Sequence, residues 1–343
     1  MKITASSVIP KRELIPVAIS ILAGGLWLIY LPSFYQDFVH QFYYMPFLGI
    51  VAATVANTTP AAAGIVYFPV LTRLQVLPIT AVRYNLMIQA YGMGLGTLKW
   101  YLVNKRLFIA KVIPVCLLGG MIGVYLSICV FPIQNPEMLM LFFNFVAFLL
   151  TQIIFASILF KKQYPNVTLD LSLRNICILL AFSFIGGLVT GWIGFGIDTI
   201  FYFILTVVFH INPAIAIITS ISLMALLSVF GTVLNALLFQ LPVSLWFAAI
   251  PGVTLAGLFL ASFIAVRIGA KNVLILFTVL LSLDFISSFW HQQCIPMDQL
   301  IRSYVLYALV VYMVFVHIKI FKTSYENVRS SLGDFHPDSN SAP

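Results

Sequence analysis

Two short polar interruptions carry the residues of this chain that are best suited to binding chemistry. Residues 57–60 (Asn-Thr-Thr-Pro) divide an apolar segment at 42–72, and residues 194–198 (Gly-Phe-Gly-Ile-Asp) divide another at 174–210. Polar groups inside an apolar segment are shielded from water, so they must form hydrogen bonds with one another or bind a ligand. The two interruptions are therefore the first candidates for a functional site.

Both interruptions predict the start of a short helix. A threonine oxygen accepts a free backbone N–H and proline has none, so Thr59 and Pro60 indicate an N-cap and the first helical residue. Asp198 stands in the same position before Thr199 and an apolar stretch. A helix start offers unpaired N–H groups and a positive dipole end to an anion, and flanking glycines let a ligand reach the backbone. The candidate substrate-binding residues here are Asn57, Thr58, Thr59, Gly64, Gly194, Gly196, Asp198 and Thr199. The alternative is that they only form caps and tight turns in a buried hairpin.

Asp198 is also a candidate for proton coupling. A carboxylate at membrane depth costs about 2.5–3.5 kcal/mol on insertion scales, and such residues are usually functional. Our hypothesis is that ionised Asp198 repels an anion and protonated Asp198 admits it. The alternative is a purely structural N-cap whose charge the helix dipole partly neutralises.

Four further polar residues follow the interruptions. Asn85, Thr219 and Ser220 lie in otherwise apolar helices, where they either line the same site or form hydrogen bonds between helices. Arg83 lies just inside the start of its predicted helix. It either attracts anions from outside or extends to the membrane interface.

The composition identifies the solvent that surrounds these residues. Of 343 residues 62% are hydrophobic and only 8% are charged, against about 25% in soluble domains, and the net charge is +8. This excludes a water-soluble globule and a nucleic-acid-binding protein, and it requires lipid as the solvent. The cysteines and histidines lack the spacing of a metal site or a disulfide framework, and no phosphate-binding loop is present. We therefore expect no metal and no cofactor.

Long apolar runs without alternation predict an all-α polytopic membrane protein. Straight helices over 42–72 and 174–210 would measure about 46 Å and 55 Å, against a hydrocarbon core of about 30 Å, so each segment should fold back as a broken-helix hairpin. With both termini in the cytoplasm, all but three of the eighteen Lys and Arg residues fall on the cytoplasmic side. The chain then has about eight full crossings plus two hairpins, the crossings being 15–31, 80–103, 108–132, 137–160, 213–239, 243–266, 272–290 and 301–321.

The two halves of the chain also repeat each other. Residues 65–68 match 200–203 at an offset of 135, and Gly49 matches Gly186 at 137. An odd number of crossings separates the halves, which predicts inverted-topology repeats of the kind that secondary transporters use. The expected units are an N-terminal extra helix (1–41), a first repeat (42–160), a cytoplasmic linker (161–173), a second repeat (174–290), a C-terminal extra helix (291–323) and a disordered tail (324–343).

Residues 187–196, with their glycines, and the later Pro213-x-x-Ala216-x-x-Thr219-Ser220 resemble the TauE/SafE family of membrane anion exporters over about residues 42–290. The resemblance implies a carrier of sulfite, sulfonates or related organic anions in the bacterial cytoplasmic (inner) membrane. The sequence departs from the family pattern at residues 61–64 (Ala-Ala-Ala-Gly), at Asp198, where glycine is usual, and in a first interruption that is two residues longer.

We therefore expect a secondary transporter, most simply an exporter, that moves a small anion by alternating access. An anion channel is one alternative, and an intramembrane lipid-modifying enzyme is another. The expected partners are the small anionic substrate, the lipid bilayer and, as a homodimer, a second copy. The ten acidic residues are scattered, which argues against an enzyme.

Overall fold

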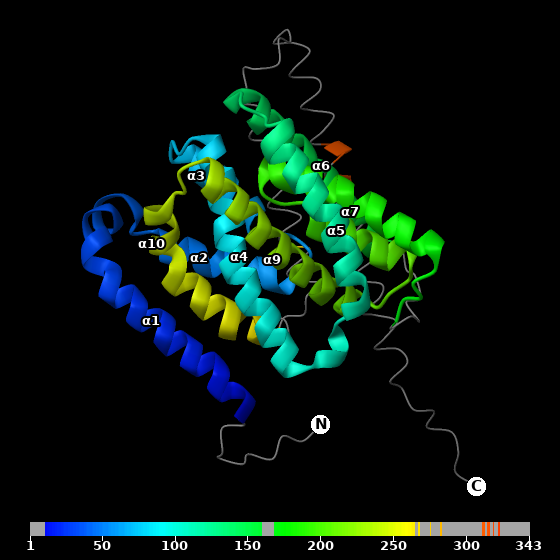
Figure 1. Cartoon of the computed structure of the whole chain (residues 1–343), viewed down its shortest axis with the longest axis horizontal. Helices are drawn as coiled ribbons and strands as arrows, with labels where there is room; N and C mark the ends of the chain where they lie inside the picture. The colour runs from blue at the N-terminus through cyan, green and yellow to red at the C-terminus, as the bar shows by residue number, and fades with distance from the viewer. Residues whose placement is uncertain are drawn as a thin grey trace.

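The computed structural model describes residues 11–159 and 168–264, together with positions 267, 275, 282, 311, 312, 314, 315, 318 and 322. Within this part of the chain the backbone is helical and contains no strand (Figure 1). The helices are α1 (Lys11–Asp37), α2 (Met45–Thr58), α3 (Gly64–Arg73), α4 (Pro78–Val103), α5 (Ile113–Tyr125), α6 (Pro136–Leu159), α7 (Leu173–Ile193), α8 (Ile197–Phe203), α9 (Pro213–Leu238), α10 (Val243–Leu255) and α11 (Ala261–Ile264).

Several helices are apolar and long enough to cross a membrane. In the described residues five segments meet this condition: Leu14–Phe42, Ala110–Val130, Leu173–Ile193, Pro213–Leu238 and Val243–Ile264. Some of them gain length from five-residue π-helices that continue α1, α5 and α10. Shorter apolar helices cover Met45–Thr58, Pro136–Leu149 and Ile197–Val208. The expected all-α membrane architecture is confirmed at this level.

Both long apolar segments are broken where the sequence predicts. The first break (residues 59–63) separates α2 from α3, and the second break (residues 194–196) separates α7 from α8. The two arms before the breaks differ in length, since α2 would measure about 21 Å and α7 about 31 Å. α7 alone is therefore long enough to cross the hydrocarbon core of a bilayer, which is about 30 Å thick, whereas α2 is not.

The predicted helix caps at the breaks are wrong. Thr59 does not start α3 but ends α2, because its backbone is extended and its hydroxyl donates to Val55 O at 2.9 Å. α3 begins five residues later, at Gly64. At the second break Gly196 is the N-cap, at φ +130, and Asp198 is the second residue of α8.

α4 and α9 pack against each other in the middle of the described helices (Figure 1). On one side α5 packs against α7, where a side chain at Gly187 would collide with the backbone of Gly120. On the other side α10 packs against α2, where a side chain at Gly252 would collide with Pro46 O. Small residues therefore let the backbones touch at both interfaces, as is common between membrane helices.

α1 lies against α10, at the edge of the described helices (Figure 1). The indole N–H of Trp27 donates to Phe247 O at 3.0 Å, and the two rings stack at 5.5 Å. Most of the remaining α1 surface is exposed and apolar, which suits a helix that faces lipid.

The short helices after the two breaks end alike. Gln75 follows α3 with φ +65, and His210 follows α8 and its π-helix with φ +51. These positions are 135 residues apart, the offset at which the sequence repeats. They are the positive-φ residues other than glycine in the described backbone.

Some expectations lie outside the described residues. These are the crossings at 272–290 and 301–321 except at isolated positions, the tail at 324–343, and residues 161–167 of the predicted linker. The C-terminal extra helix at 291–323 is described only at 311, 312, 314, 315, 318 and 322.

Candidate functional site

The first break touches the start of α8, directly after the second break, inside the protein. The hydroxyl of Thr199, in the first turn of α8, donates to Pro60 O in the first break at 2.7 Å. Thr199 is fully buried, as are the alanines at 61 and 62 in the first break. The structure thus brings together two segments that the sequence predicts separately. We call this contact region the junction.

Asn85, on α4, lies between the breaks. A side chain on Gly194 would meet Asn85 Cβ at 2.8 Å, and one on Gly64 would meet Asn85 Nδ2 at 3.1 Å. Asn85 is fully buried, yet neither its amide nitrogen nor its amide oxygen has a hydrogen-bond partner. Buried polar atoms are normally paired, so an unpaired amide here marks a place where a ligand or water can bind.

Gln89 extends the same face of α4 by one turn and was not predicted. Its amide nitrogen donates to Gly194 O at 2.7 Å and to Asn85 O at 2.9 Å. Its oxygen is buried and has no partner. The signal in the sequence was an amide four residues after Asn85, on the same side of an apolar helix.

Asp198 is fully buried beside the junction. One carboxylate oxygen accepts the N–H of Gly196 at 3.3 Å, and the other has no partner. The neighbouring N–H of Ile197 is taken by Thr190 Oγ1 at 3.0 Å. Asp198 therefore satisfies part of the start of α8 and keeps one oxygen unpaired.

Asn57, Thr58 and Thr59 are buried and serve mainly to end α2. The Asn57 amide nitrogen donates to Ala53 O at 2.8 Å, and the Thr58 hydroxyl donates to Thr54 O at 2.8 Å. The backbone oxygen of Asn57 accepts the indole N–H of Trp100 at 3.0 Å, which anchors this end of α2 to α4.

A small cavity lies at this end of the first break. It has a volume of about 10 Å³ and is lined in part by Asn57, Tyr67 and Gln89. A space of about 10–15 Å³ is what one water molecule needs. The protein is thus closely packed here.

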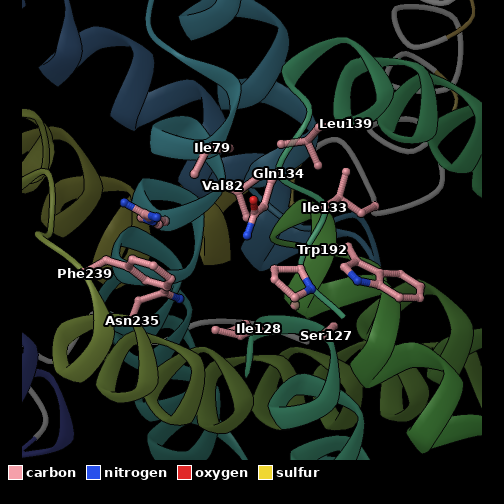
Figure 2. Close-up of a pocket in the computed structure, with 13 residues that line it drawn as sticks. Ile79, Val82, Ser127, Ile128, Ile133, Gln134, Leu139, Trp192, Asn235 and Phe239 are labelled. Carbon is pink, nitrogen blue, oxygen red and sulfur yellow. The ribbon is translucent and has the colours of Figure 1, made fainter. Parts of the chain in front are cut away.

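A much larger pocket, which we call the vestibule, adjoins the second break. Its volume is about 390 Å³. It is lined by Ile79, Val82, Arg83, Ser127, Ile128, Pro132, Ile133, Gln134, Leu139, Gly191, Trp192, Asn235 and Phe239. Figure 2 shows Phe239 and Asn235 on one side and Trp192 and Ile133 on the other, with the Gln134 amide between them. Ser127, Gln134 and Asn235 were not predicted as site residues.

The vestibule and the junction are close neighbours in the chain and in space. Val82 lines the vestibule, and its backbone oxygen would lie 3.2 Å from a side chain on Gly194. Gly191 also lines the vestibule, three residues before Gly194. One turn of α4 and the end of α7 therefore separate the open pocket from the closed junction.

Arg83 is the cation among the residues that line the vestibule. It is partly buried, and its guanidinium carbon lies 3.9 Å from the centre of the Phe239 ring, a cation–π contact. The ring covers one face of the guanidinium, while the N–H groups at its edge can still point at an anion. The sequence-based hypothesis that Arg83 attracts anions from outside stays a prediction.

Thr219 and Ser220 are buried in α9, and their hydroxyls are used locally. The Thr219 hydroxyl donates to Ile215 O at 2.7 Å and accepts the N–H of Ile109 at 3.3 Å. The Ser220 hydroxyl donates to Ile217 O at 2.8 Å. Neither is among the residues that line the vestibule or the small cavity.

The described residues contain no group of three or more His, Cys, Asp or Glu side chains that could hold a metal ion. The family model for the sulfite exporter TauE/SafE matches residues 45–287. The chain belongs to the TauE/SafE family. This is a family of membrane transporters, and the match begins at α2, so α1 precedes it. No curated protein and no solved structure matches the chain.

Proposed function

We propose that this TauE/SafE protein is a secondary carrier, most simply an exporter, of a small anion such as sulfite, a sulfonate or a related organic anion. The observation that carries the proposal is the vestibule, in which Arg83 supplies a positive charge and whose lining residue Val82 lies against Gly194, as does Asn85 with its unpaired amide. A cation in the open pocket and a free buried N–H donor behind the pocket wall are two groups that can bind an anion on its way toward the centre of the protein.

The closed junction supports alternating access rather than an open pore. The hydrogen bonds from Thr199 to Pro60 and from Gln89 to Gly194 join the two breaks and α4. An anion can pass the junction only after such contacts separate. The carrier would then have two states. In the state described here the vestibule would be the open entry to the site, and the entry from the other side of the membrane would be closed.

We further propose that the two halves are inverted repeats. The support is the common offset of the sequence matches and of Gln75 and His210. The helix pairs α5 with α7 and α10 with α2 are also related by exchanging the halves. In this arrangement both termini are cytoplasmic and the protein lies in the bacterial inner membrane.

Proton coupling through Asp198 remains part of the proposal. Its support is complete burial together with one oxygen that has no partner. A carboxylate beside the path of an anion raises the barrier to passage when it is ionised, and this barrier disappears when it is protonated.

The test is counterflow in proteoliposomes that contain the purified protein. Vesicles loaded with unlabelled sulfite or an alkanesulfonate should accumulate labelled anion from outside. Arg83→Gln should reduce the rate at least tenfold at low anion concentration, Arg83→Lys should keep part of it, and Arg106→Gln, which removes an exposed arginine outside the vestibule, should leave it unchanged. Flux that does not saturate and shows no exchange would instead indicate a channel. A rate in Arg83→Gln equal to wild type would contradict the role of the vestibule.

A further inference from the structure

The vestibule has few hydrogen-bond donors left for a ligand. The Ser127 hydroxyl donates to Gly123 O and Val124 O, each at 3.0 Å. The indole N–H of Trp192 donates to Phe131 O at 2.7 Å. One N–H of the Asn235 amide donates to Gly231 O at 2.8 Å.

Few side-chain donors in the vestibule lining therefore remain free for a ligand. They are the guanidinium edge of Arg83, the exposed amide of Gln134 and the second N–H of Asn235. Arg83 lies over Phe239, which shares one side of the vestibule with Asn235 (Figure 2). An anionic group would be held at this side.

The rest of the vestibule is apolar. Trp192 and Ile133 lie on the opposite side (Figure 2), and Ile79, Ile128 and Leu139 are among the other apolar residues of the lining. A small inorganic oxyanion exposes oxygen atoms in every direction and would lose hydration here without receiving donors in exchange. A ligand with one charged end and an apolar body needs hydrogen-bond donors at that end alone. Burial of its apolar body is favourable, because apolar surface is removed from water.

The volume of the vestibule also suits an organic ligand. At about 390 Å³ the vestibule lies within the usual range of about 300–1,000 Å³ for pockets that bind organic ligands. Such pockets are mostly apolar and contain a few polar groups that fix the orientation of the ligand.

From these observations we infer that the vestibule selects organic anions with an apolar body, such as alkyl or aryl sulfonates, over inorganic oxyanions. This inference rests on the proposed anion-carrier function and specifies its substrate class. The charged head pairs with Arg83 and Gln134, and the apolar body lies against Trp192 and Ile133.

The experiment is a binding series on the purified full-length protein, measured as ligand-induced shifts in melting temperature. The probes are sulfite, sulfate and straight-chain sulfonates from methanesulfonate to butanesulfonate. The dissociation constant should fall about fourfold for each added methylene, which is the equivalent of about 0.8 kcal/mol per buried CH₂. Sulfite and sulfate should bind more weakly than butanesulfonate.

A matched pair of variants locates the effect. Ile133→Thr places a hydroxyl in the apolar side and should flatten the dependence on chain length while methanesulfonate binding stays the same. Ile122→Thr makes the same change at an exposed position of α5 outside the vestibule and should leave the series as in wild type.

The possible failures can be told apart. A flat series, with sulfite bound as tightly as butanesulfonate, would overturn the inference and leave the anion carrier standing. Stabilisation by vesicles of anionic lipid without any response to soluble sulfonates would overturn it too, because the vestibule would then hold a lipid headgroup. If no anion shifts the melting temperature and none exchanges in counterflow, the proposed function fails as well.

Discussion

Replacement of Gly194 by alanine adds one methyl group where the second break meets α4. That methyl would lie 2.8 Å from Asn85 Cβ and 3.2 Å from Val82 O, and the residue would keep a φ of +81. The left-handed conformation costs an L-residue about 1–2 kcal/mol, and forcing a methyl group into packed surroundings costs about 1–3 kcal/mol. Because Asn85 belongs to a long helix that packs on α9, it cannot move aside alone. We expect a total loss of stability of about 2–5 kcal/mol.

The assay is thermal unfolding of the purified variant in detergent, beside counterflow in proteoliposomes. Gly94→Ala is the matched control, since nothing lies within 4 Å of the methyl group that it adds to α4. This control should melt at or above the wild-type temperature, because alanine favours a helix by up to about 1 kcal/mol over glycine. Gly194→Ala should melt clearly lower and lose most transport. If it melted and transported like Gly94→Ala, the close contact between the second break and Asn85 would be refuted.

Three further predictions follow from the junction and the proposed topology. Thr199→Val leaves Pro60 O unpaired and should lower stability by about 1–3 kcal/mol in thermal unfolding, whereas Thr199→Ser, which keeps the hydroxyl, should lose much less; equal losses would show that the hydrogen bond is unimportant. Asp198→Asn retains an oxygen for the Gly196 N–H but cannot ionise, so counterflow measured over a pH series should lose its pH dependence; an unchanged profile would exclude Asp198 as the coupling group. Single cysteines introduced at residues 33–41 and at 73–79 should react with an impermeant reagent from the same side of the membrane, and labelling from opposite sides would disprove the hairpin.

The location of both breaks could be predicted from the sequence because it depends only on length and polarity. An apolar segment that is too long for one crossing must be interrupted, and residues 57–60 and 194–198 were the polar or flexible points within the two segments. The details at the breaks could not be predicted in the same way. Thr59 has the residue type of an N-cap, but its hydroxyl bonds back to Val55 O and ends α2 instead.

The residues that surround the breaks depend on tertiary contacts. The sequence singled out Asn85 and Thr219 as equivalent candidates, since both are polar in apolar helices. The structure places Asn85 between Gly64 and Gly194, whereas Thr219 bonds within α9 and to the N–H of Ile109. Which of two polar residues faces the centre is set by the rotation of its helix against its neighbours, and local sequence does not encode that rotation.

The vestibule was missed for a related reason. Gln134 belongs to a short connection and Asn235 to the last turns of α9, and these segments are distant in sequence. Only Arg83 carried a recognisable signal, as a charge at the start of an otherwise apolar helix. Its role in attracting anions stays a prediction. The cation–π contact with Phe239 could not be predicted from the sequence, because it joins two distant segments.

The pairing of α2 with α10 and of α5 with α7 has a consequence for the synthesis of the protein. α2 emerges early from the ribosome, but α10, which contacts it closely through Gly252, is synthesised only after most of the chain. Likewise, α5 is synthesised before its partner α7. Until α10 is synthesised, the close-packing face of α2 therefore stays uncovered. A product that stops before α10 would keep that face exposed, and membrane quality control could recognise it by this missing partner.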